Sequence, residues 1–341
     1  MSDFSSLLPL GWSDSWSALL PETTVPARVI RPDGATLLVA TSDGPLSIRT
    51  PGRGGLEPTV GDWLAVEMAS RAAVAVLPRA ALLRRRDAHP GARDQLLAAN
   101  VDIVLIACGL DRPVKPGRLD RSIALAADAG ATPIIVLTKA ASAHLPDLDQ
   151  LAAQHPGVAI VVTSALEGIG IDALRDALVG RTAVLLGESG AGKSTLTNAL
   201  LGRDDAFTGD VRGDSKGRHT TTSRQLHVLD AGGVIIDTPG IRAVGLWTDP
   251  DAVDEAFSDI GAIAEECRFR DCLHDTEPGC AVREAIDDGT LSVDRHAAWR
   301  RLRREAASAE LRASPREQRR RGKTFSRAAK LGQARKRGTD Q

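Results

Sequence analysis

The first part of the chain shows apolar and polar residues in alternation. Four short stretches follow this pattern around the turn signals Asp33-Gly34 and Asp43-Gly44, namely VPARVIRP, ATLLVATSDG, PLSIRTPG and VGDWLAVEM. A period of two residues indicates strands with one buried face. Such strands predict a small barrel over residues 25–85, and their spacing favours an oligonucleotide-binding (OB-fold) type of barrel, although any small β-module would show the same alternation. Residues 1–24 are expected to form a loose lead-in.

The pattern changes to continuous apolar runs near residue 100. Four such runs, VDIVLIACG, TPIIVLTK, VAIVVTSA and TAVLLGES, are separated by helical stretches such as Leu119–Ala129 and Gly170–Leu178. Strands covered on both faces have this composition, so residues 86–245 are predicted to form a parallel sheet with flanking crossover helices, a domain of the α/β class. The carboxyl ends of such strands share one edge, where open α/β sheets bind their ligands.

Beyond Trp247 the sequence becomes helical and polar. We expect a mostly helical domain over residues 246–325 and a basic tail over 326–341. Residues Arg295 to Gln341 carry a net charge of +12, whereas the rest of the chain carries −13. A basic end on an acidic body is typical of a protein that binds nucleic acid, although a solvated helix with a frayed end would have the same charge.

The composition favours a soluble globular protein over a membrane or secreted one. The chain has 341 residues, of which 43% are apolar and 26% charged, the balance of a soluble globular protein. The longest apolar run already contains Asp102, so no segment reaches the ~18 residues of a membrane span. The first residues also lack the basic start of a secretory signal. The sequence therefore predicts a cytoplasmic protein without a membrane partner.

A phosphate-binding loop is predicted between the last apolar run and a helical stretch. Gly187-Glu188-Ser189-Gly190-Ala191-Gly192-Lys193-Ser194 fits the pattern G-x-x-x-x-G-K-S, and a strand before it and a helix after it are the setting that this motif requires. Backbone N–H groups of the loop and the helix N-terminus would hold phosphates. Lys193 is expected to bridge the β- and γ-phosphates and Ser194 to bind Mg²⁺. The predicted nucleotide contacts extend to Thr195.

Two later segments carry the remaining phosphate chemistry. Asp237 follows the strand residues 234–236, and Gly240 comes three residues later in the sequence DTPG. We expect Asp237 to hold the magnesium ion through water and the Gly240 N–H to contact the γ-phosphate. Thr222 is our candidate for a third magnesium contact, although the sequence does not separate it from Thr220 and Thr221. A flexible surface loop would have the same composition.

Base recognition is predicted at the ends of two earlier strands. Thr138-Lys139-Ala140-Ala141 resembles the N/T-K-x-D signature that reads guanine, and Ser164-Ala165 resembles the supporting S-A element. The methyl group of Ala141 accepts no hydrogen bond, and leaving the polar groups of guanine unpaired costs ~1–3 kcal/mol, so we expect weakened guanine selectivity. These elements precede the phosphate loop, which reverses the ordinary GTPase order, so the chain is predicted to be a circularly permuted P-loop GTPase.

Cysteine and histidine residues cluster in CRFRDCLHDTEPGC. Cys267, Cys272, His274 and Cys280 supply three thiolates and one imidazole, which close a tetrahedral zinc site and leave no position for water. We therefore expect a structural zinc ion in the helical domain, in preference to a disulfide in a reducing compartment. Cys108 lies within an apolar run and is expected to be a small core residue.

Together these motifs resemble the RsgA family of circularly permuted GTPases, the small-ribosomal-subunit biogenesis GTPases. The resemblance covers about residues 25–300 and rests on VGDW, LAANVD, GESGAGKST, GRHTTT, DTPG and the cysteine motif. It implies an OB-fold barrel, a permuted GTPase domain and a zinc domain. It also implies GTP hydrolysis that the 30S subunit stimulates late in its maturation. The family lacks the usual water-positioning glutamine, a pattern that Ile241 fits, and its proposed catalytic histidine matches His219.

The predicted function is therefore that of a GTP-hydrolysing assembly factor, expected to be a monomer, that docks on small-subunit rRNA and is released on hydrolysis. Its cofactors would be one structural Zn²⁺ per chain and Mg²⁺ with GTP. Two alternatives remain. Ala141 favours a nucleotide-indifferent RNA-binding scaffold, which the intact Lys193, Ser194 and Asp237 oppose. Ala141 also favours an ATPase with relaxed base selectivity, which the permuted order and Ser164-Ala165 oppose.

Overall fold

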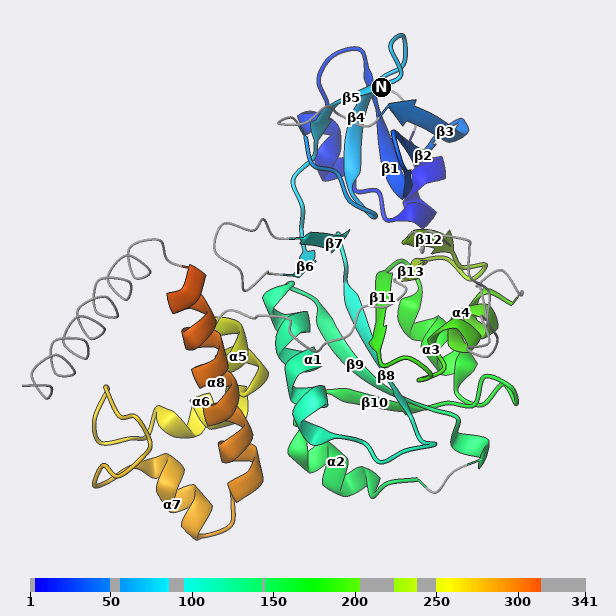
Figure 1. Ribbon diagram of the computed structural model, residues 1–341. Helices are drawn as coiled ribbons and strands as arrows, with labels where there is room; N and C mark the ends of the chain where they lie inside the picture. Colours follow the sequence, from blue (N-terminus) through cyan, green and yellow to red (C-terminus); the bar gives the residue numbers. More distant parts are fainter. Residues whose placement is uncertain are drawn as a thin grey trace, which may run out of the picture. The chain divides into compact units, whose positions relative to one another are not determined.

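The computed structural model of the protein describes residues 4–49, 56–85, 95–142, 145–202, 224–237 and 250–313. The chain divides into two compact units, residues 1–84 with 96–246 and residues 85–95 with 247–341. The first unit runs from blue to green in Figure 1, and the helices of the second are yellow to orange. None of the helices in the described ranges combines the length and the apolar character of a membrane span.

Five short strands form the barrel that the alternating pattern predicts. They close in the order β1-β2-β3-β5-β4 (Figure 1). Their bounds are β1 (Thr24–Asp33), β2 (Thr36–Thr41), β3 (Gly44–Arg49), β4 (Trp63–Glu67) and β5 (Ala72–Val76). Every second residue points inward, as strand geometry requires. The interior is aliphatic and consists of Ala27, Val29, Leu37, Val39, Ile48, Leu64 and Val66.

Residues before the barrel are packed against it, whereas we expected a loose lead-in. Two 3-10 helices, η1 (Ser5–Leu10) and η2 (Asp14–Leu19), precede β1. Leu7 is fully buried, and the ring centroids of Trp12 and Trp63 lie 4.9 Å apart in an edge-to-face arrangement. Such an aromatic pair contributes about 0.5–1.5 kcal/mol beyond its buried area, which explains the order of a segment without long helices or strands.

The central sheet of the first unit has six strands in the order β10-β9-β8-β11-β13-β12. All neighbours are parallel except β12, which is antiparallel to β13. The strands are β8 (Ile103–Gly109), β9 (Thr132–Thr138), β10 (Ala159–Val162), β11 (Thr182–Gly187), β12 (Gln225–Val228) and β13 (Val234–Asp237). The two short strands β6 (Leu82–Arg85) and β7 (Gln95–Ala99) pair separately.

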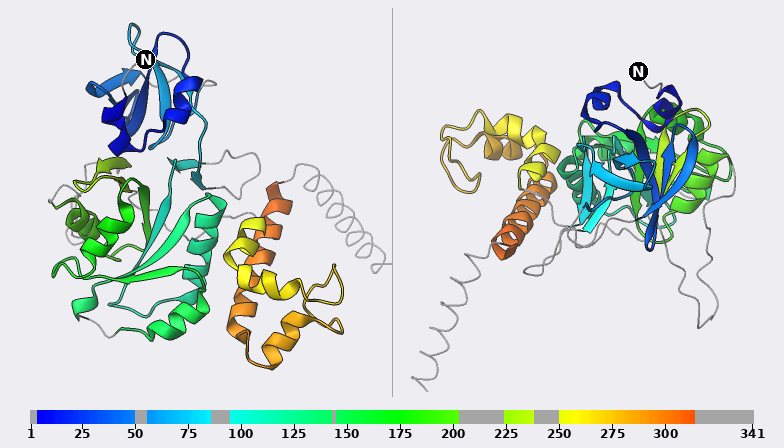
Figure 2. Two further views of the ribbon diagram at one scale, coloured as in Figure 1. Left: turned by 180° about the vertical axis from the view of Figure 1, so that it is seen from behind. Right: turned by 90° about the horizontal axis from the view of Figure 1, so that it is seen from above.

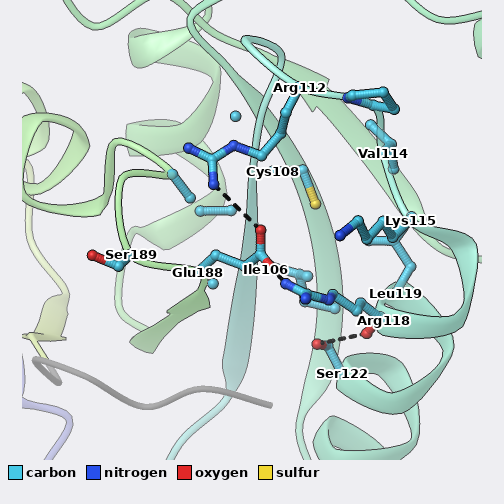
Figure 3. A pocket seen from close by; sticks show the side chains of 15 residues that line it. Ile106, Cys108, Arg112, Val114, Lys115, Arg118, Leu119, Ser122, Glu188 and Ser189 are labelled. Atoms are coloured by element: carbon cyan, nitrogen blue, oxygen red, sulfur yellow. Dashed lines mark hydrogen bonds and ion pairs between the residues drawn. The ribbon is translucent and has the colours of Figure 1, made fainter. Parts of the chain in front are cut away.

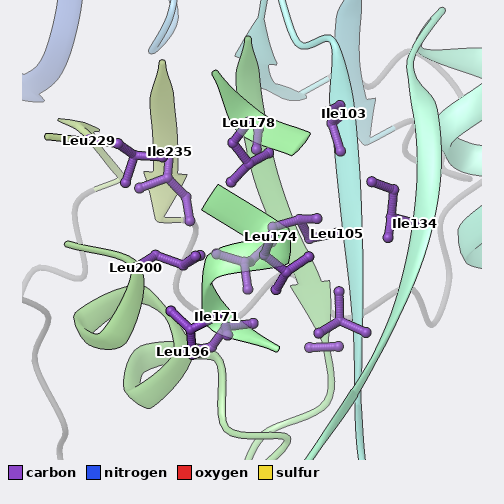
Figure 4. Packing of buried hydrophobic residues seen from close by; sticks show 14 of the residues in the cluster. Ile103, Leu105, Ile134, Ile171, Leu174, Leu178, Leu196, Leu200, Leu229 and Ile235 are labelled. Carbon is purple, nitrogen blue, oxygen red and sulfur yellow. The ribbon is translucent and has the colours of Figure 1, made fainter. Parts of the chain in front are cut away.

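Helices cover the sheet as crossover connections. They are α1 (Pro116–Asp128), η3 (Ala140–Ser142), α2 (Leu148–Gln154), α3 (Ile171–Leu178) and α4 (Lys193–Leu201). Leu174 and Leu178 of α3 pack with Leu196 and Leu200 of α4 in one buried cluster against β8, β9, β11 and β13 (Figure 4). This cluster fixes the start of α4 relative to the end of β11, which is where the phosphate loop lies.

A buried arginine joins the barrel to the sheet. Arg28 of β1 is 1% exposed. Its guanidinium donates to the carbonyl oxygen of Gly61 at 3.3 Å, to the hydroxyl of Thr182 at 2.8 Å and to the carbonyl oxygen of Leu10. Burial lowers the pKa of Arg28 to about 10, while the nearby carboxylate of Asp102 opposes that shift, so the group stays charged at neutral pH.

In residues 250–313, the described part of the second unit, the helices are α5 (Pro250–Ala256), α6 (Ser258–Ala264), α7 (Ala281–Asp287) and α8 (Val293–Ala313) (Figure 2). Helix α8 buries a stripe of residues at positions 295, 299, 302 and 306, the spacing of one helix face. Arg295 of this stripe pairs with Asp259 at 2.8 Å and stacks over the ring of Phe257. The Trp299 indole N–H donates to Asp254 at 2.9 Å.

Candidate functional site

The predicted phosphate loop joins β11 to α4. The loop turns through Gly190 and Gly192, whose φ angles of 77° and 80° lie in the left-handed region that glycine accepts most readily. The Lys193 amine folds back over the loop, and its Nζ donates to the carbonyl oxygens of Gly187 at 2.9 Å and Glu188 at 2.8 Å. The lysine charge is thus held at the centre of the loop, at the start of a helix that also favours anions.

The predicted magnesium contacts lie on two neighbouring elements. Ser194 is the second residue of α4, and Asp237 is the last residue of β13. Strands β11 and β13 are adjacent and parallel, so the phosphate loop and Asp237 both lie at the carboxyl edge of the sheet. Both side chains are partly buried. Three predicted site residues lie outside the described residues, and these are His219, Thr222 and Gly240.

The predicted base-binding elements meet the phosphate loop directly. The Thr138 hydroxyl, at the end of β9, donates to the carbonyl oxygen of Ala191 at 2.7 Å. The segment leading to Ser164 and Ala165 is tied to the same region, since the Ala140 N–H donates to the carbonyl oxygen of Thr163 at 3.0 Å. Ala141 is exposed. The carboxyl ends of β9, β10 and β11 therefore bring together residues that are far apart in the sequence.

The Lys139 side chain makes an ion pair that the sequence did not indicate. Its Nζ lies 2.9 Å from Oδ2 of Asp111, a residue of the turn after β8. The Lys139 ammonium, and secondarily the Arg112 guanidinium at 3.2 Å, lowers the pKa of Asp111. No local motif marks Asp111, because the pair joins residues 28 positions apart.

A cavity of about 480 Å³ lies beside the phosphate loop, between the end of β8 and the start of α1 (Figure 3). Glu188 of the loop lies between Arg112 and Arg118 and pairs with both. Cys108 also lines this cavity, so it is less completely enclosed than the core position we expected. Burial raises the pKa of the Cys108 thiol to about 11, which keeps it protonated and chemically inert at neutral pH.

The four predicted metal ligands converge in the second unit. The ligand atoms of Cys267, Cys272, His274 and Cys280 all lie within 4.8 Å of one another. Nδ1 of His274 is 3.5 Å from Sγ of Cys267 and 3.5 Å from Sγ of Cys280, and the two sulfurs are 4.0 Å apart. Ligand atoms at the corners of a tetrahedron, with metal–ligand bonds of about 2.0–2.3 Å, lie about this far from one another. The three sulfurs and one nitrogen therefore fit a single metal ion that prefers such ligands, as zinc does.

The loop that carries these ligands is shaped by a carboxylate that sequence reasoning missed. Glu277 accepts hydrogen bonds from the backbone N–H groups of Asp275, Leu273 and Thr276 at 2.9–3.1 Å. These bonds lower the pKa of Glu277 to about 2. In the sequence, Glu277 is an acidic residue between His274 and Cys280. Exposed acidic residues are common in such loops, so nothing in the sequence alone marked Glu277 as important.

Comparison with known proteins agrees with this geometry. The sequence profile of the RsgA GTPase family matches residues 76–247. A protein of Streptomyces coelicolor named small ribosomal subunit biogenesis GTPase RsgA is 44% identical over 322 residues, which cover 89% of this chain and 87% of the relative. A relative of the same name from Opitutus terrae is 42% identical and covers 91% of this chain and 92% of its own length.

Solved structures show the same architecture. YjeQ from Thermotoga maritima is 25% identical with a TM-score of 0.64, and the match covers 83% of this chain and 99% of that one. YloQ, described as a circularly permuted GTPase, shares the fold at 21% identity with a TM-score of 0.60, over 84% of this chain and 96% of its own. The predicted permuted fold and the resemblance noted from the motifs are both confirmed. The chain belongs to the RsgA GTPase family.

Proposed function

We propose that this protein hydrolyses GTP and acts in the biogenesis of the small ribosomal subunit. The observation that carries the proposal is the phosphate loop, which holds the Lys193 amine at its centre and opens at the strand edge where Asp237 also lies. The names of its relatives support the ribosomal role, since both proteins compared above are small ribosomal subunit biogenesis GTPases. Such a factor works where these subunits are assembled, in the cytoplasm, and we propose that it does so as a monomer.

The nucleotide contacts follow from the sheet edge. We propose that residues Gly187 through Thr195 cradle the phosphates and that Thr138, Lys139, Ser164 and Ala165 surround the base. Mg²⁺ would be held by Ser194, by Asp237 through water and by Thr222, while Gly240 contacts the γ-phosphate. The bound magnesium would neutralise charge on the β- and γ-phosphates. Zn²⁺ would occupy the cluster of Cys267, Cys272, His274 and Cys280, where it has a structural role.

The second unit exposes arginines that suit contact with ribosomal RNA. Helix α8 exposes Arg301, Arg303 and Arg304, and the metal-ligand loop exposes Arg268 and Arg270. Arginine binds phosphate with paired hydrogen bonds, and each neutralised phosphate releases counterions, so binding to RNA should weaken as salt rises. These arginines support small-subunit rRNA as the partner.

Lys193→Ala is expected to lower GTP turnover about 10²–10³-fold, because the phosphates lose a charged donor in a partly buried site. The measurement is phosphate release from GTP and from ATP, with and without purified small ribosomal subunits. Arg181→Ala is the control, since Arg181 is an exposed cation just before β11, at the end of that strand away from the phosphate loop. Equal turnover by the Lys193 and Arg181 variants would contradict the enzyme proposal.

Ala141 gives specific support to an ATPase with relaxed selectivity as a second candidate function. The exposed methyl group at this position cannot discriminate guanine from adenine. The same assay separates the candidates: subunit-stimulated turnover of GTP alone supports the GTPase, and equal turnover of ATP supports the alternative. Subunit binding without turnover of either nucleotide would leave only an RNA-binding scaffold.

His219→Ala is expected to lower subunit-stimulated GTP turnover while GTP affinity stays unchanged. An imidazole near the γ-phosphate can orient the attacking water, and this general acid–base contribution is typically about 10²–10⁴-fold. Single-turnover hydrolysis on small subunits measures the first effect and nucleotide titration the second. Unchanged stimulated turnover would remove His219 from the mechanism, and lost GTP affinity would assign it a binding role instead.

A further inference from the structure

The base-binding region of this protein lacks the carboxylate that its signature would place at residue 141. Ala141 lies in the short η3 turn and is exposed, so its side chain offers no acceptor to a nucleobase. The lysine of the signature is present, however, and it has a carboxylate partner in another loop. That partner is Asp111, at 2.9 Å from the Lys139 amine.

The two loops that carry this pair are held together by the backbone. The Leu110 N–H donates to the carbonyl oxygen of Thr138 at 3.0 Å, which fixes Asp111 next to Lys139. A Cβ atom added to Gly109 would lie 2.6 Å from Oδ1 of Asp111, so the carboxylate returns close to the backbone at the end of β8. Lys139 itself has a φ of +64°, a conformation that costs energy for a residue with a side chain.

This arrangement directs the Lys139 side chain along the phosphate loop. A Cβ atom added to Gly192 would lie 3.9 Å from Cε of Lys139 and 3.4 Å from the Thr138 hydroxyl. The Cε methylene of Lys139 therefore lies beside Gly192, the N-cap residue of α4 in the phosphate loop. An apolar stem fixed at both ends, by its strained backbone and by Asp111, presents a flat surface on which a purine can lie.

A second feature concerns the edge of the base. Ala165 is partly buried beside Ser164, and its backbone N–H is the hydrogen-bond donor that we assign to the base edge. A 6-oxopurine presents an acceptor oxygen at its six-position, whereas adenine presents an amine there. The 2-amino group of guanine is a donor and needs an acceptor such as the carboxylate that Ala141 lacks.

We propose that Asp111 is a positioning residue that holds Lys139 in the base pocket, and that this pocket recognises 6-oxopurines without reading the 2-amino group. The substrate class is therefore 6-oxopurine nucleoside triphosphates, with inosine triphosphate (ITP) bound as well as GTP. The inference rests on the proposed function, because it concerns the same nucleotide site. It adds to that function a positioning residue, Asp111, that lies outside the signature motif. It also adds the expectation that the site accepts a purine without a 2-amino group.

The test is a titration of the full-length protein with GTP, ITP and ATP in the presence of Mg²⁺. The wild type is expected to bind GTP and ITP equally and ATP more weakly. Asp111→Asn is expected to weaken GTP and ITP by the same factor, about threefold to fivefold for a partly exposed ion pair. Asp111→Glu, which keeps the charge, should recover the affinity. Ala141→Asp should raise the affinity for GTP over ITP at least roughly tenfold by supplying the acceptor.

Asp149→Asn is the matched control, since Asp149 is an exposed carboxylate in the first turn of α2. The melting temperatures of all variants should equal that of the wild type. If Asp111→Asn weakens GTP but not ITP, Asp111 reads the 2-amino group directly and the proposal is wrong. A wild-type preference for GTP over ITP of tenfold or more would also overturn it.

Failure of this inference is distinguishable from failure of the proposed function. If Asp111→Asn binds GTP as the wild type does while Lys193→Ala does not bind it, the positioning role is refuted and the GTPase proposal stands. If the wild type binds no purine triphosphate at all, both proposals fall together.

Discussion

Arg28→Met is expected to lower the free energy of unfolding of the first unit by about 3–5 kcal/mol, because several buried acceptors lose their charged donor and each unsatisfied group costs ~1–3 kcal/mol. Methionine is similar in length, so the change removes the donors without opening a large cavity. The carbonyl oxygen of Gly61 and the hydroxyl of Thr182 would lose their guanidinium partner. Urea unfolding followed by tryptophan fluorescence measures the effect, because Trp63 lies against Arg28.

Arg31→Met is the control for this prediction. Arg31 is on the same strand and pairs with Asp33 at 2.7 Å, but both side chains are more than one-third exposed. Loss of an exposed ion pair costs about 0–1 kcal/mol. An equal shift of the unfolding midpoint in both variants would contradict the prediction. It would show that the buried hydrogen bonds of Arg28 contribute no more to the free energy of unfolding than an exposed ion pair does.

The same variant separates stability from nucleotide binding. Arg28 contacts Thr182 at the first residue of β11, whereas the phosphate loop begins at Gly187, the last residue of that strand. GTP affinity under native conditions should therefore stay unchanged when Arg28 is replaced. The role of Arg28 is therefore structural, because its hydrogen bonds connect the barrel to the sheet.

The elements that the sequence predicted well are those with a strong local pattern. Continuous apolar runs gave β8, β9 and β11 because a strand buried on both faces has no polar position to interrupt it. The phosphate loop was predictable because a backbone that encloses phosphates needs glycine at fixed positions, here Gly190 and Gly192. The cluster of three cysteines and one histidine was predictable because few roles other than metal binding gather these residues in so short a segment.

The features that were missed depend on contacts between distant residues. Arg28 lies in an alternating strand and reads as a solvent-facing residue, and only the closed barrel and the sheet behind it make its position buried. Asp111 and Lys139 become partners through the parallel pairing of β8 and β9. The segment before the barrel was misjudged as loose because 3-10 helices have weak sequence signals and its order comes from packing of Trp12 and Trp63.

Removal of the proposed zinc ion is expected to unfold much of the second unit. The ligand loop from Cys267 to Cys280 contains no regular helix or strand, and it connects α6 to α7. The helices beneath it share a small core around Phe257, Trp299 and Leu302. A small core gives little stability by itself, and a structural zinc site contributes apparent free energies of about 10–16 kcal/mol in small domains. The proposed zinc ion is therefore the largest single stabilising contribution that we expect in this unit.

Cys280→Ala tests this expectation, because Cys280 is the buried cysteine among the proposed ligands and lies at the N-cap of α7. The variant should lose bound zinc, measured by elemental analysis, and the thermal transition of the helical unit should broaden or disappear in far-ultraviolet circular dichroism. Cys108→Ser is the control, since Cys108 lies outside the cluster and should leave the zinc content at one per chain. Treatment of the wild type with a chelator should reproduce the Cys280→Ala result. A chelated protein that keeps its helical transition would show that the core of the second unit folds without the metal.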